Sequence, residues 1–229
     1  MVTYYYLGWF NNFFPNNLAH ALSRDTTTRH SLVMISSNPA STSVNGFTEL
    51  SWLEDAGIIF DEYHLINYEV GQKEAKRRIS EASMIFLLGG DTVKQNMFLY
   101  EYDLLESIQS NGGIVIGASA GAINMSSKWV CSPNLGYSTS ATTIYNGLAL
   151  HDFSVLSHFD LEHNMGVVKQ ELALLSEELP VYASNKDCAI RVQEKRIEIF
   201  GDVYLYSQRN MTKLTEGVHS VTDYPSPLQ

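Results

Sequence analysis

Short apolar runs recur along the chain and predict buried β-strands. Each run is rich in β-branched or aromatic residues, as expected of strands that are covered on both faces. The runs occupy residues 2–7, 31–36, 58–66, 84–88 and 114–116.

The segments between these runs carry helical patterns. Helices are predicted at residues 15–23, at 43–56 and at 73–82. Ser43 is the expected cap of the second helix and Gly57 its end. One more helix is predicted after residue 92, because a set of apolar residues falls on one of its faces. The set comprises Val93, Met97, Leu104 and Ile108.

Buried strands that alternate with helices predict a doubly wound α/β fold, with a mostly parallel sheet and helices on both faces. This pattern covers about the first 125 residues. The remainder is richer in β-structure, with one helix near residues 167–178 and strands at 153–158, 180–184, 188–192, 197–200 and 203–206. We expect a single domain over residues 1–207, followed by a loosely held tail at 208–229.

Composition and charge exclude several classes of function. The 229 residues carry a formal net charge of −10 without a cluster of basic residues, which argues against a nucleic-acid partner. No apolar stretch approaches the roughly 18–20 residues of a membrane span, and the first residues do not resemble a signal peptide. Cys131 and Cys188 lie far apart, which indicates reduced thiols and a cytoplasmic protein without a metal site or other cofactor.

The strongest chemical signal is the sequence Gly-Ala-Ser-Ala-Gly at residues 117–121, between a predicted strand and a predicted helix. A G-x-S-x-G motif at such a turn is typical of a nucleophile elbow, in which Ser119 would project above the sheet. The amide of Ala120 could then face an oxyanion at the start of the helix. The alternatives are a turn of small residues that serves packing only, or a phosphate-binding loop.

Two other places complete a candidate hydrolytic site. Gly89 and Gly90 follow the preceding strand, where the Gly90 amide could be a second oxyanion donor; the alternative is an ordinary glycine turn. His158 ends an apolar run and is the best candidate for the base, although a strand-end histidine can also be purely structural. Asp160 and Asp187 are the candidates for the acid that orients the imidazole.

In this order and spacing, the Gly-Gly turn, the elbow and the Ser-His-Phe segment at 157–159 resemble the peptidase E (α-aspartyl dipeptidase) and cyanophycinase group. The resemblance spans residues 2–207. It implies a class I glutamine amidotransferase-like, flavodoxin-like fold, with serine in place of the nucleophilic cysteine. It also implies a serine peptidase in which Ser119 is the nucleophile, His158 the base, and the Gly90 and Ala120 amides the oxyanion donors.

The chain departs from this group at the acid and at the specificity residue. The resemblance implies an acid about fifteen residues after the serine, where this chain has Asn134, or a glutamate before a late strand, where it has Lys186. Asp160 instead matches the acid of glutamine amidotransferases, two residues after the histidine. Peptidase E recognises an N-terminal aspartate partly through an arginine in the helix after the histidine, and here that region offers only Lys169.

These features predict a serine exopeptidase that hydrolyses short peptides through an acyl-enzyme on Ser119. A binding protein of the same fold without activity, and an acyl hydrolase with a non-peptide substrate, remain alternatives. The 13 tyrosines and 10 phenylalanines would permit a self-association surface as well as a core, so a homo-oligomer stays open.

Overall fold

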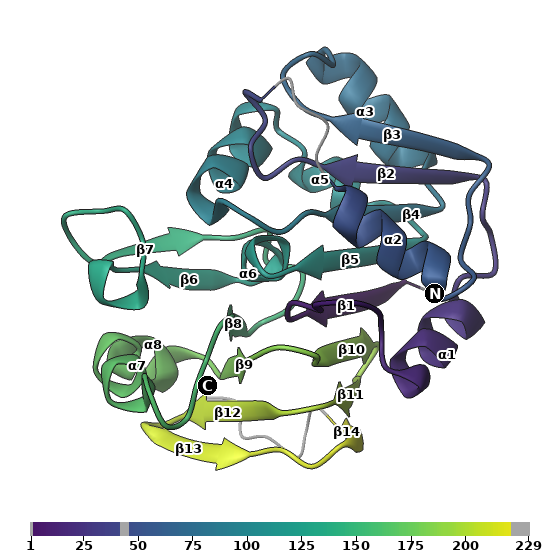
Figure 1. The fold of residues 1–229 in the computed structure, drawn as a ribbon. Helices are drawn as coiled ribbons and strands as arrows, with labels where there is room; N and C mark the ends of the chain where they lie inside the picture. Colours follow the sequence, from purple (N-terminus) through teal and green to yellow (C-terminus); the bar gives the residue numbers. More distant parts are fainter. Residues whose placement is uncertain (1, 42–45, 221–229) are drawn as a thin grey trace.

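The structure, a computed structural model, describes residues 2–41 and 46–220. Within these residues, eight strands form the main sheet in the order β14-β11-β10-β1-β5-β4-β2-β3 (Figure 1). The five strands from β1 to β3 in this order are mutually parallel. Their bounds are Thr3–Leu7 (β1), Ser31–Ile35 (β2), Glu62–Ile66 (β3), Met84–Leu87 (β4) and Ile114–Ala118 (β5).

The last third of the chain extends this sheet and builds a second one. Three antiparallel strands continue the main sheet beyond β1, and they are β10 (Ala189–Gln193), β11 (Arg196–Phe200) and β14 (Gly217–Ser220). The second sheet has the order β13-β12-β9-β8. Its strands are β8 (Ser154–Leu156), β9 (Val181–Ser184), β12 (Val203–Ser207) and β13 (Asn210–Lys213). A separate hairpin pairs β6 (Lys128–Cys131) with β7 (Thr143–Asn146).

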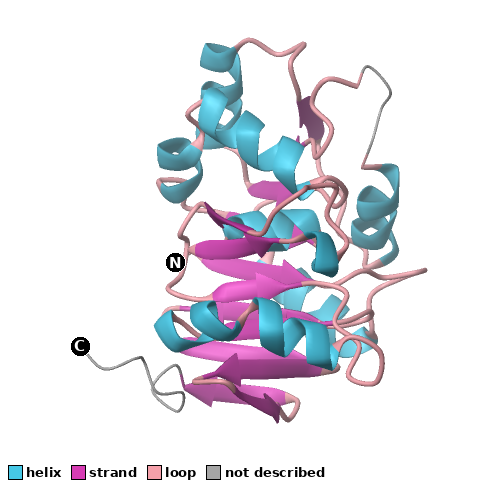
Figure 2. Ribbon diagram, turned by 90° about the vertical axis from the view of Figure 1, so that its left-hand side faces the viewer, coloured by secondary structure: helices cyan, strands magenta, loops and turns pink. Residues whose placement is uncertain are grey.

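Helices cover both faces of the main sheet (Figure 2). Successive residues of a strand point to opposite faces, so Leu32 and Met34 pack with α1 and α2, while Val33 and Ile35 pack with α3 to α6. The helices are α1 (Asn16–Asp25), α2 (Phe47–Asp55), α3 (Gln72–Glu81), α4 (Thr92–Glu101), α5 (Leu105–Gln109), α6 (Ala120–Met125), α7 (Met165–Glu171) and α8 (Ala173–Glu178), with a 3₁₀ turn η1 at Pro133–Leu135. The predicted fold class is therefore confirmed. No helix in the described parts of the chain is both long and apolar enough to cross a bilayer.

Three local expectations need correction. The single helix predicted after residue 92 is two helices, because Asp103 adopts φ 51° and ends the first. Met97, expected on the buried face, is 61% exposed, and Phe98 and Leu99 are buried instead. The helix near 167–178 is likewise divided into α7 and α8. The tail predicted to be loose from residue 208 forms β13 and β14 up to Ser220, and 221–229 lie outside the described residues.

The start of α2 differs from the expected one as well. The helix begins at Phe47, after Gly46 in the left-handed region at φ 93°, and ends before Gly57 at φ 72°. Ser43, the expected cap, lies outside the described residues.

Candidate active site

Ser119 occupies a sharp turn at the carboxyl end of β5, immediately before α6. Its backbone has φ 47° and ψ −104°, a conformation that a side chain rarely tolerates and that the surrounding structure must enforce. The main-chain N–H of Ser119 donates to the Leu7 carbonyl at 3.0 Å, which ties the turn to the neighbouring strand β1. The serine is 7% exposed.

The two glycines of the motif are required by close approach. A Cβ on Gly121 would stand 2.0 Å from the Leu87 carbonyl oxygen of β4, and one on Gly117 would stand 2.5 Å from the Gly121 carbonyl carbon. Because real Cβ atoms do not approach other atoms so closely, only glycine lets α6 pack against β4 and β5 in this arrangement. The local sequence thus produces the elbow that it predicts.

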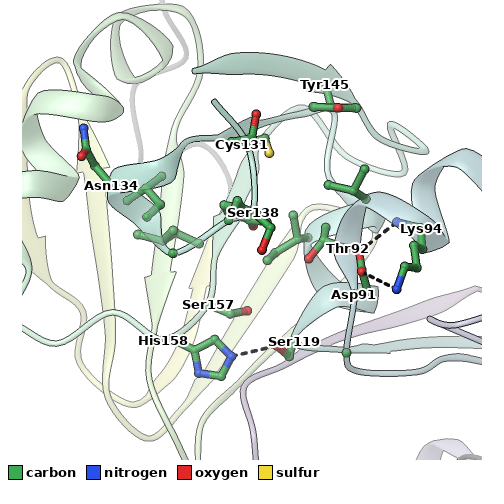
Figure 3. Close-up of a pocket in the computed structure, with 18 of the residues that line it drawn as sticks. Asp91, Thr92, Lys94, Ser119, Cys131, Asn134, Ser138, Tyr145, Ser157 and His158 are labelled. Atoms are coloured by element: carbon green, nitrogen blue, oxygen red, sulfur yellow. Dashed lines mark hydrogen bonds and ion pairs between the residues drawn. The ribbon is translucent and has the colours of Figure 1, made fainter. Parts of the chain in front are cut away.

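The elbow meets His158 across the carboxyl ends of the strands. Ser119 Oγ and His158 Nε2 are 3.1 Å apart, within hydrogen-bonding distance (Figure 3). His158 follows β8 with φ 62°, and the Asn164 side chain donates to its carbonyl at 3.0 Å. The next residue, Phe159, is buried and donates its N–H to the Ser184 carbonyl. These contacts fix the backbone on both sides of the imidazole.

Two effects lower the pKa of His158 below its usual value of 6.5. The first is partial burial among protein atoms, and the second is the positive charge of Lys186. Lys186 is exposed and pairs as an isolated bridge with Trp9. A lowered pKa keeps the imidazole neutral near pH 7, the state in which its nitrogen can accept a proton.

The structure does not bring either predicted acid to this imidazole. Asp160 accepts from the main-chain N–H of His163, and its Oδ1 lies 2.9 Å from Nδ1 of the His163 ring. Asp187 has φ 53°, and its N–H donates to the Trp9 carbonyl at 3.1 Å. Over residues 2–41 and 46–220, no hydrogen bond or ion pair joins His158 to a carboxylate.

Asn134 stands where the resemblance implies one of the acids. It lines the cavity on the side away from His158, and its amide donates to the Glu171 carboxylate at 2.6 Å (Figure 3). Within residues 2–41 and 46–220, Ser119 and His158 therefore form a pair to which no carboxylate is hydrogen-bonded.

The turn after β4 lies beside the elbow, because Leu87 pairs with Gly117 across the parallel strands. Gly90 has φ 131°, and a Cβ there would meet Ser37 Oγ at 2.4 Å. Two side chains hold the Gly89 peptide groups: Ser37 donates to the Gly89 carbonyl at 2.5 Å, and Glu49 accepts from its N–H at 3.0 Å.

Sequence reasoning missed Glu49. It lies in the first turn of α2, where an acidic residue is expected to face solvent, yet it is only 4% exposed. Burial raises the pKa of its carboxyl above the usual value. A buried carboxylate against a glycine turn is costly unless it is hydrogen-bonded, and the Gly89 amide supplies such a bond.

Ser119 and His158 open into a cavity of about 750 Å³, the size of a site for a small molecule or short peptide. The cavity is lined by residues 90–94 after β4 and by Ile123 of α6. Further lining residues come from the segments 131–139 and 156–168 and from Tyr145 of β7. Asp91 caps α4 through the Lys94 N–H and forms an ion pair with the Lys94 ammonium at 3.2 Å. Among the residues that the structure describes, no cluster of three or more acidic, histidine or cysteine side chains could hold a metal ion.

Comparisons with known proteins find the same fold in two solved structures. The structure is similar to that of a peptidase from an acI-B1 Actinobacterium, with a TM-score of 0.66 and 18% identity over 96% of this chain and 97% of the other. It is also similar to the "Putative Peptidase E Protein" of Listeria monocytogenes EGD-e, with a TM-score of 0.61 and 17% identity over 94% and 100% of the two chains. At these identities the likeness shows a shared fold.

The sequence itself assigns the family. No curated protein matches the sequence. Residues 41–200, more than half of the chain, match the profile of peptidase family S51. The protein is therefore a member of peptidase family S51, a family of serine peptidases.

Proposed function

We propose that the protein is a serine exopeptidase that cleaves short peptides through an acyl-enzyme on Ser119. The observation that carries this proposal is the 3.1 Å contact between Ser119 Oγ and His158 Nε2 at the wall of a cavity. A neutral imidazole at this distance can take the serine proton while Oγ attacks the peptide carbonyl.

The proposed reaction then follows the double-displacement route. The Gly90 and Ala120 amides would donate to the oxyanion of the tetrahedral intermediate. Collapse of the intermediate breaks the C–N bond, and the imidazolium returns its proton to the departing amine. Water then attacks the ester with the imidazole as base again, and the peptide's carboxylate product leaves with Ser119 restored.

The absence of a carboxylate beside His158 in the described residues predicts a slow enzyme. The acid of a triad orients the imidazole and stabilises its charged form, and changing it lowers kcat by about 10⁴ in well-studied serine proteases. Here the backbone contacts of the His158 segment supply orientation, whereas Lys186 opposes the charged form. We therefore expect turnover below that of enzymes with a complete triad.

The test of this proposal is labelling with a fluorophosphonate, located by mass spectrometry, together with a panel of dipeptides. We expect a covalent adduct on Ser119 and release of amino acids from the panel. A protein that is neither labelled nor active would be the inactive binder, and one that cleaves esters but no peptide would be the acyl hydrolase. Either result would refute the peptidase proposal.

The buried Glu49 is expected to support catalysis from outside the reaction centre. Glu49→Leu removes the acceptor of the Gly89 N–H and so loosens one of the two side-chain contacts that hold the turn before Gly90, while the Ser37 contact with the Gly89 carbonyl remains. We expect kcat to fall about 10- to 100-fold with KM little changed. This loss is smaller than the roughly 10²- to 10³-fold fall in kcat when an oxyanion donor is removed, because the donor here is only displaced. Glu49→Gln keeps an oxygen acceptor and should retain most of kcat. An equal loss in both variants, or a change confined to KM, would show that Glu49 does not position this turn.

Lys186 is expected to set the acidic limb of the pH–rate profile. The reaction needs neutral His158, so kcat/KM falls as pH drops through the pKa of this group in the free enzyme. Because the Lys186 charge lowers that pKa, Lys186→Ala should raise it and move the limb to higher pH. The profile is best measured at low ionic strength, where an exposed charge is least screened. Lys169→Ala is the control, since the Lys169 charge is not among the causes that lower the pKa of His158. An unchanged limb in Lys186→Ala would contradict the assignment.

A further inference from the structure

Aromatic side chains wall the part of the cavity that lies across from Ser119 and His158. Trp129 of β6 is 1% exposed, and its ring stacks on Tyr145 of β7 at 4.6 Å and 12°. The Trp129 ring also packs against the Tyr137 ring, with the two ring centroids 5.6 Å apart and an angle of 32° between the ring planes. Tyr137 and Tyr145 both line the same cavity as Ser119. The buried Trp129 therefore holds two tyrosine rings in place at the cavity surface.

Two apolar residues connect this wall with the elbow. Ile123 of α6 and Cys131 of β6 pack with Trp129 in one hydrophobic cluster, and both also line the cavity. Figure 3 shows Cys131 and Tyr145 at the far side of the cavity from Ser119. We call Tyr137, Tyr145, Ile123 and Cys131 the aromatic wall.

The charges around the cavity do not suit an acidic side chain. Among the described lining residues, Asp91 and Lys94 are the fixed charges, and they neutralise each other in a 3.2 Å ion pair. The Asp91 carboxylate also caps α4 by accepting from the main-chain N–H of Lys94. Lys169, on helix α7 after His158, does not line the cavity. A carboxylate placed at the aromatic wall would lose its hydration without gaining a cation.

We propose that the aromatic wall is a subsite for an uncharged apolar or aromatic side chain of the substrate, so that the enzyme prefers such peptides to acidic ones. This inference rests on the proposed peptidase function and names its substrate class. Rigid aromatic surfaces bury large ligand area at low cost in conformational entropy, which suits recognition of an apolar side chain.

A hydroxyl beside His158 is available for the backbone of a peptide whose side chain lies at the aromatic wall. Ser157 Oγ is buried, lines the cavity and has no hydrogen-bond partner in the described parts of the chain. In Figure 3 its side chain lies beside His158 at the edge of the cavity. Buried polar groups normally have partners, and the peptide N–H or C=O of a bound substrate would be one.

Binding to the Ser119→Ala variant tests the subsite without requiring turnover. The probes are the dipeptides Phe-Ala, Ala-Phe, Asp-Ala, Ala-Asp and Ala-Ala, and calorimetry gives their Kd values. We expect one of the two Phe dipeptides to bind about 10- to 200-fold tighter than Ala-Ala, the range that an altered apolar group produces in a hydrophobic pocket. Neither Asp dipeptide should bind tighter than Ala-Ala. Preference for an Asp dipeptide, or equal binding of all five, would overturn the inference.

A second pair of variants locates the preference. The measured quantity is the ratio of binding affinities (1/Kd) for the better Phe dipeptide and for Ala-Ala. In the Ser119→Ala background, Tyr145→Ala should reduce this ratio at least about fivefold, since it removes one ring of the wall. Ile144→Ala should leave the ratio unchanged, because Ile144 is the adjacent residue of β7, is exposed and does not line the cavity. A ratio that stays high in Tyr145→Ala would refute the wall as the subsite.

A partial loss of folded protein affects both affinities equally and therefore does not change their ratio. If Tyr145→Ala does not fold at all, the dipeptide panel on Ser119→Ala decides the inference by itself. Failure of the proposed function appears elsewhere, as absent fluorophosphonate labelling and absent turnover in the unmodified protein. A labelled, active enzyme that prefers acidic peptides would refute this inference and leave the peptidase proposal intact.

Discussion

Replacing Ser119 by alanine is expected to lower kcat on the best dipeptide by about 10³- to 10⁴-fold and to abolish fluorophosphonate labelling. Loss of the serine in enzymes with a complete triad costs about 10⁶ in kcat. The expected loss is smaller here because His158 has no carboxylate partner in the described residues, so the starting activity is lower. The activity that remains would come from binding and from oxyanion contacts. Release of amino acids, followed by chromatography over hours, measures the difference.

His158→Ala should produce a loss of similar size, because the two side chains act as one unit and their effects do not add. The double variant should therefore be no slower than either single one. His163→Ala is the control: it alters an exposed histidine five residues along the same segment, which pairs with Asp160 and does not contact Ser119. Activity above a tenth of the unmodified enzyme in Ser119→Ala would show that the nucleophile lies elsewhere.

Adding a single methyl group at Gly121 is expected to destabilise the whole protein. In Gly121→Ala the new Cβ would meet the Leu87 carbonyl oxygen at 2.0 Å. That oxygen belongs to the backbone of β4 and the Cβ is fixed by the backbone of α6, so neither atom can rotate away. Overpacking of a core typically costs 1–3 kcal/mol, and this contact places the substitution at or above about 3 kcal/mol. For a chain of this size that loss corresponds to a fall in Tm of roughly 6–12 °C.

Urea unfolding of Gly121→Ala and Gly112→Ala makes the comparison direct. Gly112 precedes the same strand β5, and a Cβ there would meet nothing within 4 Å. We expect Gly112→Ala to change the free energy of unfolding by less than about 1 kcal/mol. Similar unfolding curves for the two variants would mean that α6 can move away from β4 and that the elbow is less constrained than its contacts indicate.

The features that could be predicted from sequence are those that neighbouring residues determine. Strand β2 is buried along its whole length, so its apolar run could be recognised without knowledge of its partners. The elbow could be recognised from its own short motif, although the need for glycine at 121 comes from Leu87 of the neighbouring strand β4. The position of His158 followed from the place where an apolar strand ends.

Features that depend on distant partners could not be predicted in this way. Glu49 acts on a glycine forty residues later, and nothing in its own helix distinguishes it from a solvated acid. The hairpin β6–β7 was not expected, although Trp129 and Tyr145 lie on short β-prone runs, because its strands are short and a loop separates them. The break at Asp103 requires a left-handed residue that is not glycine, which no simple pattern signals.

The place of β1 in the main sheet has a consequence for biosynthesis. Thr3–Leu7 pairs with Ile114–Ala118 on one side and with Ala189–Gln193 on the other. Strand β1 is synthesised before both partners and must therefore wait for them, and the second partner begins only at Ala189. Such long-range pairing slows folding and leaves an apolar edge exposed to aggregation in the meantime. Since the Ser119 N–H donates to the Leu7 carbonyl, a nascent chain that stops before β10 is complete should hold the turn at Ser119 against a strand that lacks one of its two partners.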